Sequence, residues 1–195
     1  MSDAKGVRYG VKNVYYAVYD ESNGTYGTPV AMKGCTALTL TPVGNTWTFY
    51  ADDIAYEQGV TNGGYTIEPT IAVLGDDAKR DLLGEEAGTG LQYEVADAKP
   101  NSVALMWEFE GSKVNKVACL YNVKFQRPTQ TGSTTTDTIE PDTDTISGTA
   151  IGRDMTIGTG QDAVVKNVIK ATASDSDSTY ANWFTAVQMP GEVVH

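Results

Sequence analysis

A pair of alternating segments at residues 102–128 limits the possible folds more than any other feature. Apolar and more polar side chains alternate along VALMWEF and again along KVACLYNVKF, with a turn at residues 111–115 between them. A period of two places successive side chains on opposite faces of a strand. The segment therefore predicts a long antiparallel hairpin with a dry face and a wetter face. The wetter face would carry Ala104, Met106, Glu108 and Glu110, and the dry face Val103, Leu105, Trp107, Phe109, Val117, Cys119, Tyr121, Val123 and Phe125.

Shorter segments elsewhere share this β character. We expect strands at residues 14–20, 35–42, 46–51, 64–74, 146–155 and 163–174. The second and third of these would pair around a turn at residues 42–45, which places residues 50–53 at the exit of the hairpin. Pro69 cannot donate a hydrogen bond to a ladder, so it indicates an edge strand or a bulge. The chain is therefore predicted to be mainly β.

The remaining segments are expected to flank these strands. We expect a short helix within residues 75–84. Asp76 or Asp77 would cap its start, and Gly84 would end it. Leu82 and Leu83 would pack the helix against the core. Residues 1–13 predict a flexible N-terminal arm, and residues 129–147 predict a long acidic loop rich in threonine. Residues 175–195 form a C-terminal segment in which a short helix would carry Trp183 and Phe184. A single domain over residues 1–195 accommodates all of these, with the three tryptophans, Trp47, Trp107 and Trp183, as core anchors.

The charge balance argues against a protein that grips nucleic acid. Asp and Glu total 25 against 14 Lys and Arg, which gives a net charge of −11 and a pI of about 4.4. Proteins that bind nucleic acid tightly usually carry the opposite excess. An acidic chain can instead line a path to which DNA must not adhere.

Residues for most enzyme chemistry are scarce, so we expect neither an enzyme nor a cofactor. His195 is the only histidine, which removes Ser-His-Asp and Cys-His catalysis and nearly every zinc site. Cys35 and Cys119 are expected to be reduced, buried thiols, because two cysteines cannot make a disulfide framework. No glycine-rich run continues into Gly-Lys-Ser/Thr, as a phosphate loop would. No apolar run reaches the length of a membrane helix, and residues 1–13 lack the apolar region of a signal peptide.

The acids Asp52 and Asp53 follow Tyr50-Ala51, an order in which reverse transcriptases hold metal ions. Two-metal chemistry needs carboxylates from at least two segments and basic residues for the phosphates. No basic residue lies between Lys33 and Lys79. The pair is expected instead to accept backbone N–H groups where a strand ends, or to meet a basic partner. The acidic run at residues 142–148 lacks the third acid, the central glycine and the terminal glutamate of a calcium loop.

The order of these segments resembles the major tail (tube) proteins of long, non-contractile-tailed bacteriophages of Gram-positive hosts. The resemblance extends over residues 7–187. Its most specific parts are NTWTFYADDIAYE at residues 45–57 and GYTIEPTIAVLGDDAKRDLLG at residues 64–84. The VALMWEF…KVACLYNVKFQRP hairpin, the threonine-rich loop, DTISGTAIGR and a late NWF follow in the same order.

This resemblance implies a phage tail-tube fold, a β-sandwich or barrel with one short flanking helix, long hairpins and an extended arm and loop. Six copies would form a ring, and stacked rings would form a tube whose bore is a continuous β-barrel. DNA would pass through the bore without specific binding. The expected partners are further copies of the chain, the tape measure protein, and the tail terminator and distal tail proteins, with no membrane binding. The expected location is the virion tail, after synthesis and assembly in the host cytoplasm.

Two groups of residues are expected to serve this assembly. An interface group would pair acids of one copy with bases of a neighbour: Tyr50, Asp52, Asp53, Tyr56, Glu57, Arg8, Lys12 and Arg153. A bore group, Glu68, Glu108 and Glu110, would keep DNA off the wall by repulsion that salt confines to about 8 Å.

Three alternatives stay open on the sequence. The chain can be another tail assembly protein of the same fold, namely a contractile-tail tube, a terminator or a completion protein. It can also be a binding module such as an adhesin or a carbohydrate-binding β-sandwich, which would expose a cluster of aromatic residues. An enzyme is the third alternative, and the scarcity of bases and metal ligands disfavours it.

Overall fold

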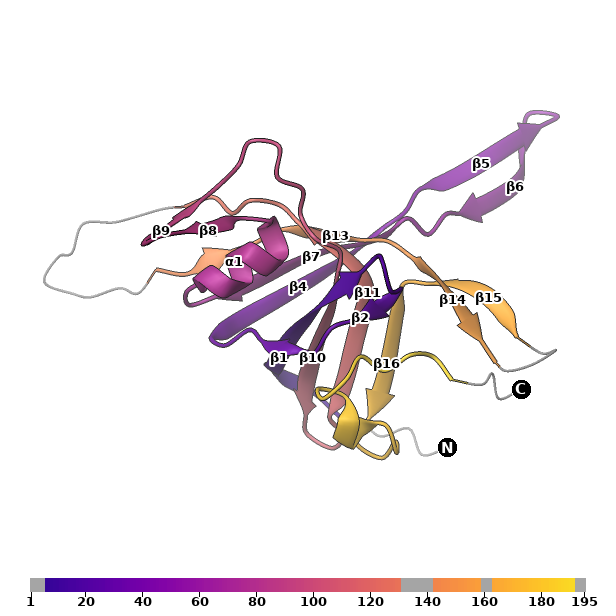
Figure 1. Cartoon of the computed structure of the whole chain (residues 1–195). Helices are drawn as coiled ribbons and strands as arrows, with labels where there is room; N and C mark the ends of the chain where they lie inside the picture. The colour runs from indigo at the N-terminus through magenta and orange to yellow at the C-terminus, as the bar shows by residue number, and fades with distance from the viewer. Residues whose placement is uncertain (1–5, 131–141, 159–162, 192–195) are drawn as a thin grey trace, which may run out of the picture.

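The computed structural model describes residues 6–130, 142–158 and 163–191, and it is mainly β, as predicted (Figure 1). The first half contains β1 (Arg8–Asp20), β2 (Thr25–Tyr26), β3 (Val30–Ala31), β4 (Cys35–Val43), β5 (Thr46–Ala51), β6 (Ile54–Val60), β7 (Gly64–Ile71), α1 (Asp76–Leu83), β8 (Glu86–Gly88) and β9 (Leu91–Tyr93). The second half contains β10 (Val103–Gly111), β11 (Lys116–Phe125), β12 (Asp144–Thr145), β13 (Gly148–Ala150), β14 (Arg153–Ile157), β15 (Val164–Val168), β16 (Lys170–Ser174) and the 3₁₀ helix η2 (Tyr180–Asn182).

In the described part of the chain, ten strands form one antiparallel sheet. Its central path runs β12-β7-β13-β11-β10-β1-β2, while β4 pairs with β7, β3 with β1, and β16 with β11. Three two-stranded ladders, β5–β6, β8–β9 and β14–β15, lie outside this sheet. Alternating sequence thus produces antiparallel pairing throughout the described residues, as period-two patterns favour.

The hairpin at residues 102–128 is confirmed as β10–β11, but the prediction of a wetter face is wrong. Ala104 and Met106 are fully buried, and Glu108 is only 3% exposed. A second apolar layer covers this face, because Trp183 and Phe184 of the C-terminal segment pack against it. The strands are therefore buried on both sides, a situation that alternation alone does not reveal.

The predicted single apolar face of β11 is also divided. Leu105 lies opposite Leu120, whereas Val103 lies opposite Val123, so β11 contains one extra residue between these pairs. A bulge of this kind reverses the side to which the following side chains point. As a result Val117, Cys119 and Tyr121 belong to the core under the C-terminal segment, and Val123 and Phe125 belong to the other core.

The core on the opposite face of the sheet contains α1. Leu82 and Leu83 dock the helix as predicted, and Gly84 ends it in the left-handed conformation at φ 75°. The predicted cap is wrong, because Gly75 occupies the N-cap position without a side-chain hydrogen bond. Asp76 and Asp77 lie instead in the first turn, where acidic side chains interact favourably with the helix dipole.

The hairpin predicted for residues 35–51 pairs differently from the expectation. β4 pairs with β7 and β5 pairs with β6, so residues 42–45 are not a turn. The first of these ladders packs the partly buried Leu38 and Leu40 against the main core, which local alternation between neighbouring strands does not show. Pro69 lies in β7 where its partner changes from β12 to β13, an interruption that suits a residue without an N–H group.

The predicted flexible segments are more ordered than expected where the structure describes them. Residues 8–13 of the expected arm belong to β1, while residues 1–5 lie outside the described residues. In the expected loop, residues 131–141 lie outside the described part, but Asp144 pairs with Ile71 and Ile146 is fully buried. The strands expected at residues 146–155 and 163–174 are each divided in two, as β13 and β14 and as β15 and β16. The C-terminal helix is only the single turn η2, which precedes the buried Trp183.

Candidate assembly surface

β5 and β6 form a two-stranded ribbon that projects from the body of the protein (Figure 1). The ribbon continues the β4–β7 ladder, because Gly63 donates its N–H to Val43 at 2.7 Å and Thr61 donates its N–H to Asn45 at 2.8 Å. The backbone from β4 to β7 is therefore one long hairpin, of which only the inner part is covered by the core.

A glycine at the root of the ribbon allows this change. Gly64 has φ 104°, a conformation that residues with a Cβ rarely adopt, and a Cβ there would lie 2.1 Å from the Ala150 carbonyl oxygen. The backbone of β13 thus approaches β7 too closely for any side chain. The root of the ribbon is fixed against the main sheet at this contact.

The tip of the ribbon is the turn made by Asp52 and Asp53. Both residues have positive φ values, 51° and 58°, as the two central residues of a type I′ hairpin turn require. Aspartate tolerates this conformation better than most residues with a side chain. The two acids therefore form the turn that connects β5 to β6, and they do not lead away from a β4–β5 hairpin as the sequence predicted.

Large apolar side chains are exposed on this ribbon. Their exposed fractions range from 46% to 76%, and they are Trp47, Phe49, Tyr50, Ile54, Tyr56 and Val60. The rings of Phe49 and Tyr56 meet edge to face with centroids 6.4 Å apart. An isolated two-stranded hairpin is marginally stable in water, and clustered exposed apolar residues mark an interaction surface. The ribbon is therefore the strongest candidate for a binding or assembly surface.

Of the three tryptophans predicted as core anchors, Trp47 is the exception. Trp107 and Trp183 are buried, whereas Trp47 is 46% exposed and lies over Gly59. The sequence did not reveal that these apolar residues are exposed, because Trp47 and Phe49 alternate with polar residues in the way that core residues of a strand do. A second apolar pattern at residues 54–60, immediately after the two acids, could have indicated that β5 pairs with β6 as a separate ribbon.

Comparison with known proteins adds no family to this geometry. Neither a scan against protein-family models nor a search of curated proteins finds a match. In the described parts of the chain, no group of three or more His, Cys, Asp or Glu residues is placed to hold a metal ion. No described helix is long and apolar enough to span a membrane.

The structure brings together five members of the predicted interface group and separates the other three. Tyr50, Asp52, Asp53, Tyr56 and Glu57 all lie on the ribbon. Arg8 and Lys12 lie on β1 and Arg153 on β14. Within the chain, no Lys or Arg of the described residues forms an ion pair with Asp52 or Asp53.

The three predicted basic partners already have contacts in their own chain. Arg8 stacks over the ring of Phe109 at 4.3 Å. The ammonium group of Lys12 lies 3.5 Å from Glu108 and 3.6 Å from Glu110, and these carboxylates, Glu108 first, raise the pKa of Lys12. Arg153 stacks on Tyr19 at 3.4 Å and donates to the Ser102 hydroxyl at 2.6 Å.

Of the predicted bore acids, Glu68 lies on a polar face of the sheet. It is exposed on β7, opposite Thr39 of β4. The cross-strand register adds further polar residues to the same face, which are Thr41, Thr66, Thr70, Lys124 and Thr149. This threonine face is opposite the side on which Leu40 and Ile67 enter the core. It is a polar surface of nearly balanced charge.

Glu108 does not belong to a wet face, and this prediction is corrected. Its carboxylate accepts hydrogen bonds from Asn13 and from Tyr180, each at 2.7 Å, and faces Lys12. It therefore ties β1, β10 and the C-terminal segment together. Glu110, two residues along β10, has a half-exposed side chain, and within the described residues Lys12 is its one ion-pair partner.

We expect Glu108→Ala to destabilise the protein by about 1.5–3 kcal/mol, because it removes the buried carboxylate that accepts hydrogen bonds from Asn13 and Tyr180. Glu110→Ala is the matched control, since a largely exposed ion pair contributes about 0–1 kcal/mol. Urea unfolding of both variants measures the difference. Equal losses for the two variants would show that the Glu108 cluster is not a structural tie.

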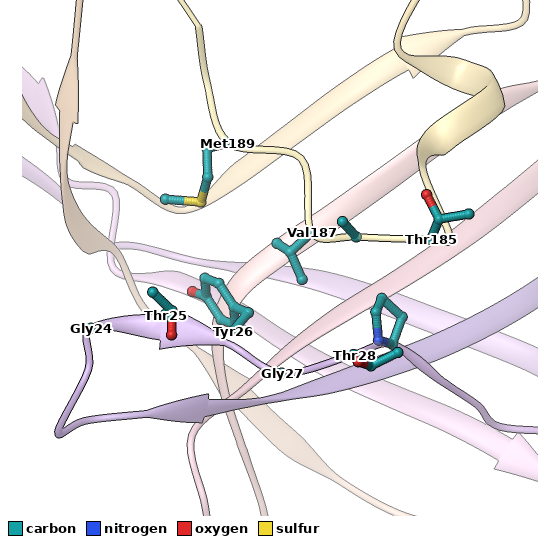
Figure 2. Close-up of a pocket in the computed structure, with 10 residues that line it drawn as sticks. Gly24, Thr25, Tyr26, Gly27, Thr28, Thr185, Val187 and Met189 are labelled. Carbon is teal, nitrogen blue, oxygen red and sulfur yellow. The ribbon is translucent and has the colours of Figure 1, made fainter.

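A hollow of about 350 Å³ separates the β2 region from the C-terminal segment. Figure 2 shows Tyr26 and Thr28 on one side and Val187 and Met189 on the other. The phenolic hydroxyl of Tyr26 donates to the Tyr121 carbonyl, and that of Tyr121 donates to the Gln188 carbonyl at 2.6 Å. None of the described residues that line this hollow is charged, so we assign it no role in pairing with the acids of the ribbon.

Both cysteines are free, as predicted. Cys119 is fully buried, and burial raises the pKa of its thiol. Cys35 is only partly buried, and its thiol donates to the Ala37 carbonyl at 3.2 Å. Neither residue is placed as a reactive thiolate.

Proposed function

We propose that this protein is a structural subunit that forms hexameric rings stacked into the tail tube of a long-tailed bacteriophage. The observation that carries the proposal is the β5–β6 ribbon, which exposes six large apolar side chains outside the core. Such a ribbon is stable when copies of the chain cover it. An exposed apolar ribbon indicates self-assembly in general. The order of segments at residues 45–57 and 64–84, which resembles that of tail tube proteins, is our reason to propose a tail tube in particular.

The edge of the main sheet supports the same proposal. Among the described residues, β4 pairs only with β7, so its other edge is available to a neighbouring strand. A long open edge is an aggregation hazard unless another chain or a charged residue covers it. Joining β4 to a neighbouring copy would remove this edge and extend the sheet around a ring.

The threonine face is our candidate for the wall of the bore. The part of it that would face the bore lies over β4 and β7, where the cross-strand register places threonines and Glu68 and no Lys or Arg. A duplex would meet hydroxyl groups there and one acid, Glu68, while Glu110 is the second candidate acid. DNA, the tape measure protein, and the terminator and distal tail proteins remain the proposed partners of the assembled tube.

The purified chain is expected to form long hollow tubes as its concentration rises. Light scattering coupled to size exclusion follows the growth, and electron microscopy identifies the tubes and their six-fold rings. A chain that stays monomeric at every accessible concentration, and that joins no tube when mixed with phage tail extracts, would contradict the proposal. A single copy per particle would favour the tail-completion alternative.

One observation favours a second candidate, a carbohydrate-binding module. The ribbon exposes the aromatic rings of Trp47, Phe49, Tyr50 and Tyr56, of which Phe49 and Tyr56 are in contact, and sugars commonly bind by stacking on such rings. Binding of cell-wall polysaccharide by the monomer, lost on substitution of Trp47, would support this candidate. Assembly into tubes without such binding would exclude it.

A further inference from the structure

Two basic side chains share a second hollow on the body of the protein. Its volume is about 260 Å³, and Lys124 of β11 and Arg153 of β14 line it. Ser102, Asn122 and Ile151 contribute further walls, and Glu21 is the one acid among the lining residues. Two cations against one acid leave a local charge of +1, in a chain whose net charge is −11.

The arginine in this hollow is held in place before any ligand arrives. Its guanidinium stacks on Tyr19 at 3.4 Å and donates to Ser102, whose hydroxyl donates in turn to Asn122 at 2.7 Å. Neither Arg153 nor Lys124 forms an ion pair with any acid in the described part of the chain. The Nε atom of Arg153 also lacks an acceptor there. A fixed guanidinium without a carboxylate partner is suited to bind one.

The ribbon tip offers carboxylates that match this site. Asp52 and Asp53 are exposed and adjacent, and the type I′ turn fixes their backbone. They have no basic partner among the described residues of their own chain. The ribbon that carries them also exposes the large apolar side chains that a neighbouring copy would cover.

We propose that the Asp52–Asp53 turn of one copy docks into the Lys124–Arg153 hollow of another copy. This inference rests on the proposed self-assembly and names one of its contacts. The donor surface and the acceptor surface are different parts of the chain, so the contact is head-to-tail. Head-to-tail contacts produce closed rings when the rotation between copies closes and filaments when it does not. A tube of stacked rings needs both kinds of contact, within a ring and between rings.

Charge reversal followed by mixing tests this contact. The tip variant is Asp52→Lys/Asp53→Lys, and the hollow variant is Lys124→Glu, which leaves the packed Arg153 in place. A control for the tip is Asp97→Lys/Asp142→Lys, which makes the same change in net charge at two exposed acids with no hydrogen bond or ion pair in the described structure. Lys113→Glu, at an exposed lysine in the β10–β11 turn, is the control for the hollow. Sedimentation velocity and electron microscopy measure assembly, and circular dichroism checks folding.

The tip and hollow variants are each expected to raise the concentration needed for assembly at least about tenfold, because each places like charges together. The controls should assemble near the wild-type concentration. An equimolar mixture of the tip and hollow variants should recover part of the loss, since the reversed charges attract again. Such recovery cannot come from a misfolded variant.

Two results overturn the inference and leave the proposed function intact. One is wild-type assembly by the tip variant, and the other is a loss in both single variants with no recovery on mixing. If the wild-type chain itself never assembles, the proposed function fails before this contact is tested. The failures of the two proposals are therefore distinguishable.

Discussion

A chain carrying Trp47→Ser, Phe49→Ser and Tyr56→Ser is expected to keep its fold and to lose assembly. These side chains contribute little to the folded monomer because each is about half or more exposed. In an assembled ring each would be covered, and full burial of a large apolar side chain contributes about 1.5–3 kcal/mol. Because each side chain is already partly covered in the monomer, the three contacts together contribute about 2–6 kcal/mol, and their loss raises the assembly concentration by at least about thirtyfold. Light scattering at rising concentration measures this change.

The control for this variant removes exposed apolar residues elsewhere. Val73→Ser, Leu91→Ser and Val164→Ser alter three side chains that are also more than half exposed but lie outside the ribbon. This variant should assemble at nearly the wild-type concentration. If both triple variants lose assembly equally, the effect reflects general surface chemistry and the ribbon has no special part in it.

Gly64→Ala is expected to destabilise the protein by about 3 kcal/mol or more. The residue has φ 104°, and the added Cβ would lie 2.1 Å from the Ala150 carbonyl oxygen, so backbone strain and a backbone clash act together. For a chain of this length the loss lowers Tm by roughly 6–12 °C. Because the clash separates β7 from β13, the root of the ribbon should loosen first, and hydrogen exchange at β7 and β13 can detect this.

Gly90→Ala separates the two causes of this loss. Gly90 also has a positive φ, 76°, but no atom of the described residues lies within 4 Å of a Cβ at that position. It therefore isolates the conformational strain, about 1 kcal/mol. A loss at Gly64 no greater than the loss at Gly90 would show that β13 moves away easily and does not fix the ribbon.

The sequence identified most strands but assigned some of their partners wrongly, for a physical reason. Alternation shows that residues 35–42 and 46–51 are extended, yet it contains no information about which strand lies beside which. The pairing of β4 with β7 depends on Leu38 and Leu40 reaching the same core as Ile67. That core is built from residues far apart in the chain, so a local pattern could not predict it.

The candidate site was predictable in its position and not in its form. The acids were correctly placed at the end of a strand, and the role of residues 50–57 in an interface stays a prediction. The turn conformation was missed because Asp-Asp is a less usual type I′ pair than Asn-Gly or Asp-Gly. Glu108 was misplaced because its acceptor role depends on Asn13 and Tyr180, which come from opposite ends of the chain.

The two-sided burial of β10 and β11 also governs how the protein folds as it is made. The layer that covers Met106 and Cys119 includes Trp183, which the ribosome adds only after β12–β16. At about 5–20 residues per second, that delay is roughly 3–12 s. During this time the nascent chain exposes an apolar sheet face, the kind of surface from which aggregation starts. Docking of the C-terminal segment is therefore the step that closes folding, and the proposed assembly would follow it.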